Sequence, residues 1–89
     1  MKRGDNWPWR FHQIATDAAY WWTPPHLAVI LRGSVERHGI EKVERAFRWW
    51  VRNVSRIERH SKWINPKSFA AKVGYWIHMS ERLSDPWQP

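Results

Sequence analysis

The stretch IEKVERAFRWWVRNVSRIERH, residues 40–60, decides the fold because it contains neither Pro nor Gly and repeats its apolar side chains at helical spacing. These side chains recur every three or four residues, the period of an amphipathic helix, and Ala46 and Val51 widen their stripe. The stripe consists of Ile40, Val43, Phe47, Trp50, Val54 and Ile57. At 1.5 Å per residue, such a helix is roughly 30 Å long. We therefore predict a long central helix along which other helices pack.

The opposite face of this helix is cationic. A rotation of 100° per residue gathers its cations on one strip, which consists of Lys42, Arg45, Arg52 and Arg56. Trp49 stands among them, so one interpretation is a phosphate-binding surface with an outward aromatic that stacks on bases. The other is a solvated face on which Trp49 packs against a neighbouring segment, with Glu41–Arg45 and Glu44–Arg48 as ion pairs. The sequence leaves both open.

Two further helices are predicted before this one. Asp5 or Asn6 can cap a helix over about residues 7–21. Thr23 can cap a second over about 24–37, because Pro is tolerated in a first helical turn. Gly39 should end it in a left-handed conformation. The short link then folds the second and third helices into a helix–turn–helix pair.

A closing helix is predicted from Pro66 to about Leu83, capped by Asn65. Its core stripe consists of Phe69, Val73, Trp76, Ile77, Ser80 and Leu83. The other side carries Lys67, Ala71, Gly74, His78 and Arg82. We expect Ala71 and Gly74 to pack tightly against a neighbouring helix; the alternative is a small patch that admits a nucleic-acid backbone.

The fold class expected from these patterns is all-α, a single small domain of about four helices. The domain should span residues 7–84, between a flexible basic tail at 1–6 and a C-terminal tail at 85–89. A chain of 89 residues that is 43% hydrophobic and holds nine Trp can build one compact core.

The charge points to polyanionic partners. Fifteen Lys and Arg against eight Asp and Glu give a net charge of +7, which suits nucleic acid, an anionic membrane or an acidic protein. The absence of Cys excludes disulfides and thiolate metal sites. No apolar run reads as a signal peptide or a membrane span, so we expect a cytoplasmic protein.

No motif in the chain indicates catalysis. The five His residues form no HExxH pattern, and neither a P-loop nor GxGxxG nor GxSxG occurs. The acids fall mostly on polar helical positions rather than as a catalytic pair. We therefore predict a protein that is not an enzyme and has no cofactor and no metal site.

The order of features from Thr23 to Leu83 resembles the C-terminal domain of DnaD-type primosomal proteins and related helical regions of phage replication proteins. The resemblance rests on HGIEKVERAF at 38–47, a long helix, a polar link, and INPKSFAAKVGYWI at 64–77. That family's closing helix carries an aromatic, then an aliphatic and a Trp at intervals of four. Phe69 and Val73 fit, whereas Ile77 takes the third place and Trp76 stands one residue early. The resemblance implies binding of single- or double-stranded DNA, contacts with replication proteins and no catalysis. A small phage or mobile-element DNA-binding protein outside that family is the other candidate.

The predicted function is therefore nucleic-acid binding, most plausibly of DNA, in replication or in a phage or plasmid process. Trp49 would contact a base or sugar, and the cations would bind phosphates. These cations are Lys42, Arg45, Arg52 and Arg56, extended by Arg48, Arg59, Lys62 and Lys67. Weak sequence specificity and a strong salt dependence should follow. The alternative is a protein–protein adaptor or inhibitor in which Trp49 is a hot spot ringed by Arg. Membrane binding is disfavoured because the apolar stripe is committed to the core, and a homodimer through Trp49 stays open.

Overall fold

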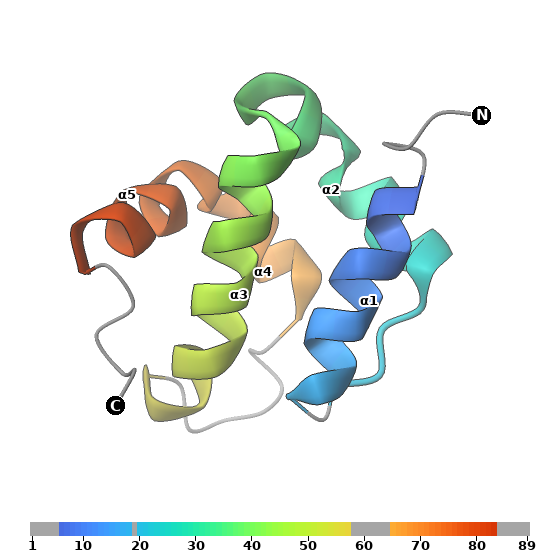
Figure 1. The fold of residues 1–89 in the computed structure, drawn as a ribbon, viewed down its shortest axis with the longest axis horizontal. Helices are drawn as coiled ribbons and strands as arrows, with labels where there is room; N and C mark the ends of the chain where they lie inside the picture. Colours follow the sequence, from blue (N-terminus) through green and yellow to red (C-terminus); the bar gives the residue numbers. More distant parts are fainter. Residues whose placement is uncertain (1–5, 19, 58–64, 84–89) are drawn as a thin grey trace.

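The fold was obtained as a computed structural model, which describes residues 6–18, 20–57 and 65–83, except for the side chains of 54–57 and 83. No strand occurs in these ranges (Figure 1). The helices are α1 (Trp7–Asp17), α2 (Pro24–His38), α3 (Ile40–Ile57), α4 (Pro66–Ala71) and α5 (Val73–Leu83). The all-α class is confirmed, with five helices in the described residues instead of four. The two predicted tails fall almost wholly outside these ranges.

Helix α1 ends at Asp17 and not near residue 21 as predicted. The chain turns back there because the Tyr20 N–H donates to the Ala15 carbonyl at 2.8 Å. The turn brings Trp22 over α3, where its ring stacks on Trp50 at a centroid distance of 5.9 Å. A helix continued to residue 21 would carry Trp22 past this site, so burial of the indole explains the early end.

The predicted cap of α2 is confirmed, and Gly39 has the predicted positive φ but an extended ψ of 144° in place of the left-handed helical value. The Thr23 hydroxyl accepts a hydrogen bond from the His26 N–H at 3.3 Å and caps the helix. Gly39 follows the last turn with a φ of 92°, a backbone conformation that residues with a Cβ rarely adopt. This one-residue link folds α3 back against α2 as a helix–turn–helix pair. The predicted extension of α3 to His60 lies outside the described residues.

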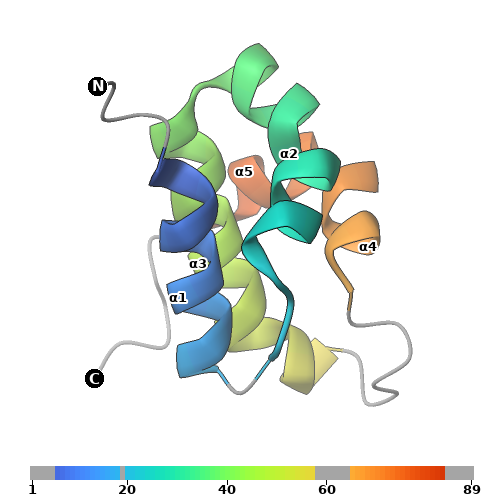
Figure 2. The same cartoon turned by 90° about the vertical axis from the view of Figure 1, so that its right-hand side faces the viewer.

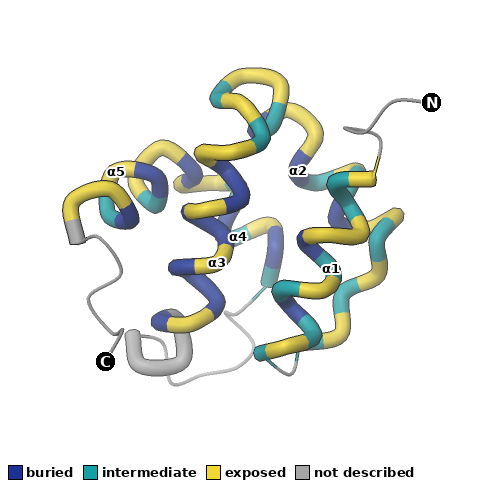
Figure 3. Tube along the Cα trace, viewed as in Figure 1, coloured by how far each residue is buried: buried dark blue, intermediate teal, exposed yellow. Residues whose placement is uncertain are grey.

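The core is an aromatic cluster that α3 shares with three of its neighbours. Phe47 and Trp50 of the predicted stripe are buried and meet the rings of Phe11, Trp22 and Phe69 at centroid distances of 5.0 to 6.2 Å. Buried and exposed segments alternate along α3 (Figure 3). The described part of the predicted stripe thus faces the interior, whereas the side chains of Val54 and Ile57 lie outside the described residues.

The predicted closing helix is two helices. Lys72 breaks it with a φ of −128° and a ψ of 36°, and its N–H donates to the Phe69 carbonyl three residues back. The break lets α4 pack on α2 while α5 packs on α3 (Figure 2). Tight packing of Ala71 and Gly74 against a helix was the wrong prediction, because both are exposed. A Cβ added at Gly74 would meet no atom within 4 Å.

Candidate nucleic-acid interface

Trp49 does not face solvent as the first interpretation required. Its side chain is only 5% exposed and packs on Trp76 of α5 at a ring-centroid distance of 6.0 Å. The alternative, that Trp49 packs against a neighbouring segment, is confirmed. The predicted homodimer and the predicted protein contact both required an exposed Trp49, so the burial of this side chain removes the basis for both. The reason is the position of α5, which covers the side of α3 that carries this indole.

Asn53 is the residue that the sequence analysis missed on this side. It lies one turn after Trp49, is 2% exposed, and donates from its side-chain amide to the Trp49 carbonyl at 2.7 Å. The sequence could have indicated the burial of Asn53, because this residue lies next to Trp49 on a helical projection of α3. Asn53 is thus tied to the turn of α3 that carries Trp49, the residue that contacts Trp76 of α5.

The cations of α3 do remain on the surface. Lys42, Arg45, Arg48 and Arg52 are all exposed, and we call them the α3 basic strip. Arg45, Arg48 and Arg52 follow one another at intervals of three and four residues and therefore share a face. The side chain of Arg56, together with Arg59 and Lys62, lies outside the described residues. Lys67 is exposed but belongs to α4, the helix that packs on α2.

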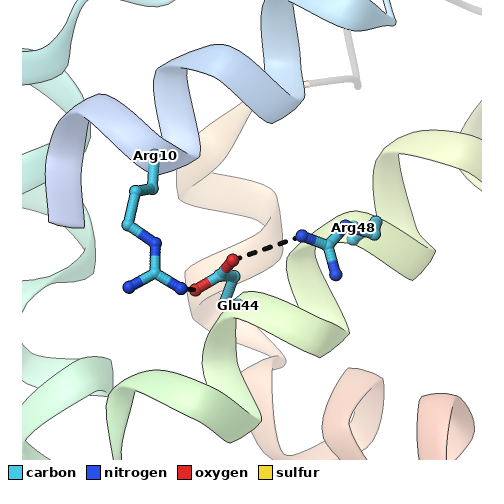
Figure 4. A network of polar contacts seen from close by, with 3 residues as sticks. All are labelled: Arg10, Glu44 and Arg48. Atoms are coloured by element: carbon cyan, nitrogen blue, oxygen red, sulfur yellow. Dashed lines mark hydrogen bonds and ion pairs between the residues drawn. The ribbon is translucent and has the colours of Figure 1, made fainter.

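A buried carboxylate organises one edge of the strip (Figure 4). Glu44 is 11% exposed in its side chain and accepts hydrogen bonds from Arg10 of α1 and, at 3.2 Å, from Arg48. The predicted Glu44–Arg48 pair is confirmed. Arg10 could not be anticipated, because it lies 34 residues away along the chain. The predicted Glu41–Arg45 pair is absent from the ion pairs of the described residues.

A groove runs between α1 and α3 beside this network. It encloses about 480 Å³ and is lined by Arg10, Gln13, Ile14, Asp17, Ala18, Glu44, Arg48, Val51 and Arg52. Three guanidinium groups and two carboxylates give its walls a small positive excess. The groove thus has a floor that includes Ile14, Ala18 and Val51 and a weakly cationic rim that borders the α3 basic strip.

The charge of the chain is concentrated on α3. This helix holds five Lys and Arg against two Glu, whereas α1 holds one Arg and one Asp. One of the two glutamates, Glu44, already binds two arginines. The exposed face of α3 therefore presents a local excess of positive charge to solvent.

No helix within the described residues has the length and apolarity to cross a bilayer. In the same ranges, no three His, Asp or Glu side chains gather closely enough to hold a metal ion. Comparisons with protein-family models, with curated proteins and with solved structures found no match. The resemblance to DnaD-type domains therefore stays a prediction.

Proposed function

We propose that this protein binds nucleic acid, with DNA as the expected form, through phosphate contacts made by the α3 basic strip. The observation that carries the proposal is the exposure of all four cations of the strip on α3, whose buried Glu44 is neutralised by Arg10 and by Arg48 of the strip. Exposed guanidinium groups suit phosphate because they are always charged and present several donors. The protein acts in this proposal as a binding module without catalysis.

The length of the strip sets how much phosphate it can reach. Arg45 and Arg52 are seven residues apart, about 10 Å along the helix axis. Such a span accommodates about three phosphate contacts, each of which contributes roughly 0.7 to 0.9 to the slope of log affinity against log salt. Affinity should then fall by about 20- to 40-fold between 50 and 200 mM salt.

Base-specific recognition is not expected from this surface. The exposed side chains of α3 in the described residues are four cations and Glu41, with no Asn, Gln, Ser or Thr among them. Base edges are read mainly by short polar side chains or by bidentate Arg on a helix inserted into the major groove. We propose binding of weak sequence specificity, in the cytoplasm, in replication or a phage or plasmid process, with a replication protein as a further partner. The resemblance to DnaD-type domains supports this setting.

The test is a pair of charge-matched variants measured by fluorescence anisotropy with labelled single-stranded and duplex DNA. Arg45→Glu with Arg52→Glu reverses two charges on the strip, and Arg32→Glu with Arg37→Glu makes the same change on exposed positions of α2. We expect the α3 variant to lose more than about tenfold in affinity at 50 mM salt and the α2 variant only a few-fold, through net charge. Equal losses, with both variants folded by circular dichroism, would contradict the site.

A protein-interaction adaptor is the second candidate because large apolar side chains outside the strip are exposed. Trp9 is 63%, Trp21 75% and Val29 78% exposed. Exposed Trp is typical of protein interfaces. If the folded protein bound neither form of DNA at low salt, this candidate would replace the first.

A further inference from the structure

The buried Trp49 is the inner end of a row of aromatic rings that reaches solvent on α5. Its ring contacts Trp76 at 6.0 Å, and Trp76 meets Tyr75 edge to face at 4.9 Å between centroids. Tyr75 is 53% exposed, which makes it one of the few large aromatic side chains in the described residues that face solvent. The sequence predicted an exposed aromatic side chain on α3, and the structure exposes a different one, Tyr75, on the neighbouring helix α5.

Tyr75 belongs to a face of α5 that is largely outside the core and meets it only at the half-buried Trp76. Tyr75, Trp76 and Met79 lie on one side of the helix, because Met79 follows the other two by four and three residues. Lys72 directly precedes α5, one turn before this group. Lys72 and Tyr75 are exposed, and Trp76 and Met79 are half-buried. A different side of α5 packs into the core, and it carries the buried residues Val73, Ile77 and Ser80. We call the first group the α5 ledge.

The α5 ledge adjoins the α3 basic strip. Helix α5 packs against α3 and runs across its direction (Figure 1), and the contact between Trp49 and Trp76 joins the two helices. Along α3, Arg45 precedes Trp49 by one turn and Arg52 follows it by one turn. Cations therefore flank the inner end of the aromatic row, and the exposed Lys72 precedes Tyr75, at its outer end, by three residues. Glu81, the acidic residue of α5, is spaced nine positions from Lys72 and falls on the opposite side of the helix.

We infer that the preferred ligand is single-stranded nucleic acid, with a base stacked on Tyr75 and the adjacent phosphates on the α3 basic strip and Lys72. The inference rests on the proposed function, because it assigns the strand form that the same surface binds. An exposed aromatic ring beside a cationic track is how proteins hold single strands without reading sequence. A duplex keeps its base faces stacked in the helix, so it gains from the cations and not from the ring.

The test compares single-stranded with duplex DNA of equal length at fixed low salt, using Tyr75→Ala, Tyr75→Phe and Trp21→Ala. Tyr75→Ala should weaken single-strand binding by between about fivefold and 100-fold and leave duplex binding unchanged. Tyr75→Phe keeps the ring and should bind single strands as the wild type does. Trp21→Ala removes another exposed aromatic, located between α1 and α2, and should leave both affinities unchanged.

Failure of this inference is distinguishable from failure of the proposed function. If Tyr75→Ala changed the two affinities equally, or neither, while the variant with reversed Arg45 and Arg52 still lost binding, the stacking role would be overturned and phosphate binding would stand. If the wild type bound neither form, both would be overturned. Because Tyr75 is exposed, Tyr75→Ala should retain the wild-type melting temperature, and a melt measured beside each titration verifies that the folds are equal.

Discussion

Replacing Glu44 by Gln should lower stability and raise nucleic-acid affinity in the same variant. The substitution keeps the shape of the side chain and removes the charge that holds Arg10 of α1 and Arg48 of α3. The guanidinium-bearing side chains are 55% and 47% exposed, so solvent screens both pairs, and each is worth about 0.2 to 1 kcal/mol. Repulsion between the two cations left behind adds to the loss. We expect a decrease of about 1 to 2 kcal/mol in the free energy of unfolding.

The effect on binding has the opposite sign because Arg48, within the strip, and Arg10, beside it, are both released from Glu44. Each additional phosphate contact would steepen the slope of log affinity against log salt by about 0.7 to 0.9. Urea denaturation followed by circular dichroism measures the stability, and anisotropy titrations at several salt concentrations measure the slope.

Glu41→Gln is the matched control for this experiment. It removes the same charge from an exposed position one turn earlier on α3, where the described residues form no ion pair with it. Its stability should change by less than about 0.5 kcal/mol. If the two variants were equally stable, the reasoning that Glu44 ties α1 to α3 would be refuted. If Glu44→Gln were less stable but the slope of log affinity against log salt were unchanged, the released arginines would not contact the phosphates of the bound nucleic acid.

Three further predictions concern the fold. Gly39→Ala should lower the free energy of unfolding by about 1 to 2 kcal/mol because of the positive φ of 92°, whereas Gly33→Ala inside α2 should raise it by up to about 1 kcal/mol. A Cβ at either position meets no atom within 4 Å, so the two variants differ in backbone conformation and not in steric clash, and their urea midpoints can be compared directly. Trp49→Ala should cost about 3 to 5 kcal/mol and Trp21→Ala less than about 0.5 kcal/mol, so similar melting temperatures for the two variants would contradict the burial of Trp49. Burial raises the pKa of the Tyr20 hydroxyl above its usual 10.0, so the unfolded chain loses this proton first. Stability should then fall as pH rises above about 10, and Tyr20→Phe should show a smaller fall between about pH 8 and 10.5 in denaturation curves.

Local signals in the sequence predicted most of the helix starts because their physics involves only neighbouring residues. Thr23 and Asn65 cap their helices through the hydrogen bonds expected of such side chains. Gly39 takes the positive φ expected at a helix end. The end of α1 was not predictable in this way, because Trp22 leaves the helix to reach Trp50, a partner distant in sequence.

The break at Lys72 has the same origin. Nothing in the sequence around Lys72 forbids a helix, and its neighbours continue the helical period. Phe69 packs on Phe47 at 5.2 Å between ring centroids, while Ile77 is buried on the side of α5 that faces the core. Helix α4 packs on α2 and α5 packs on α3, and the break between them is needed only once these helices are assembled around the core.

The sequence by itself determined the helical class, the core stripe of α3 and the presence of a cationic face, because hydrophobic period and charge order are properties of one helix. Tertiary structure alone decided which of the remaining side chains reach solvent. A helical projection gives the direction of Trp49 about its axis but contains no information on where α5 lies. The packing of α5 buried Trp49 against Trp76 and left Tyr75 of α5 exposed. Exposure depends on neighbours brought together by folding, and for that reason the candidate site could be predicted in its charges and not in its aromatic residue.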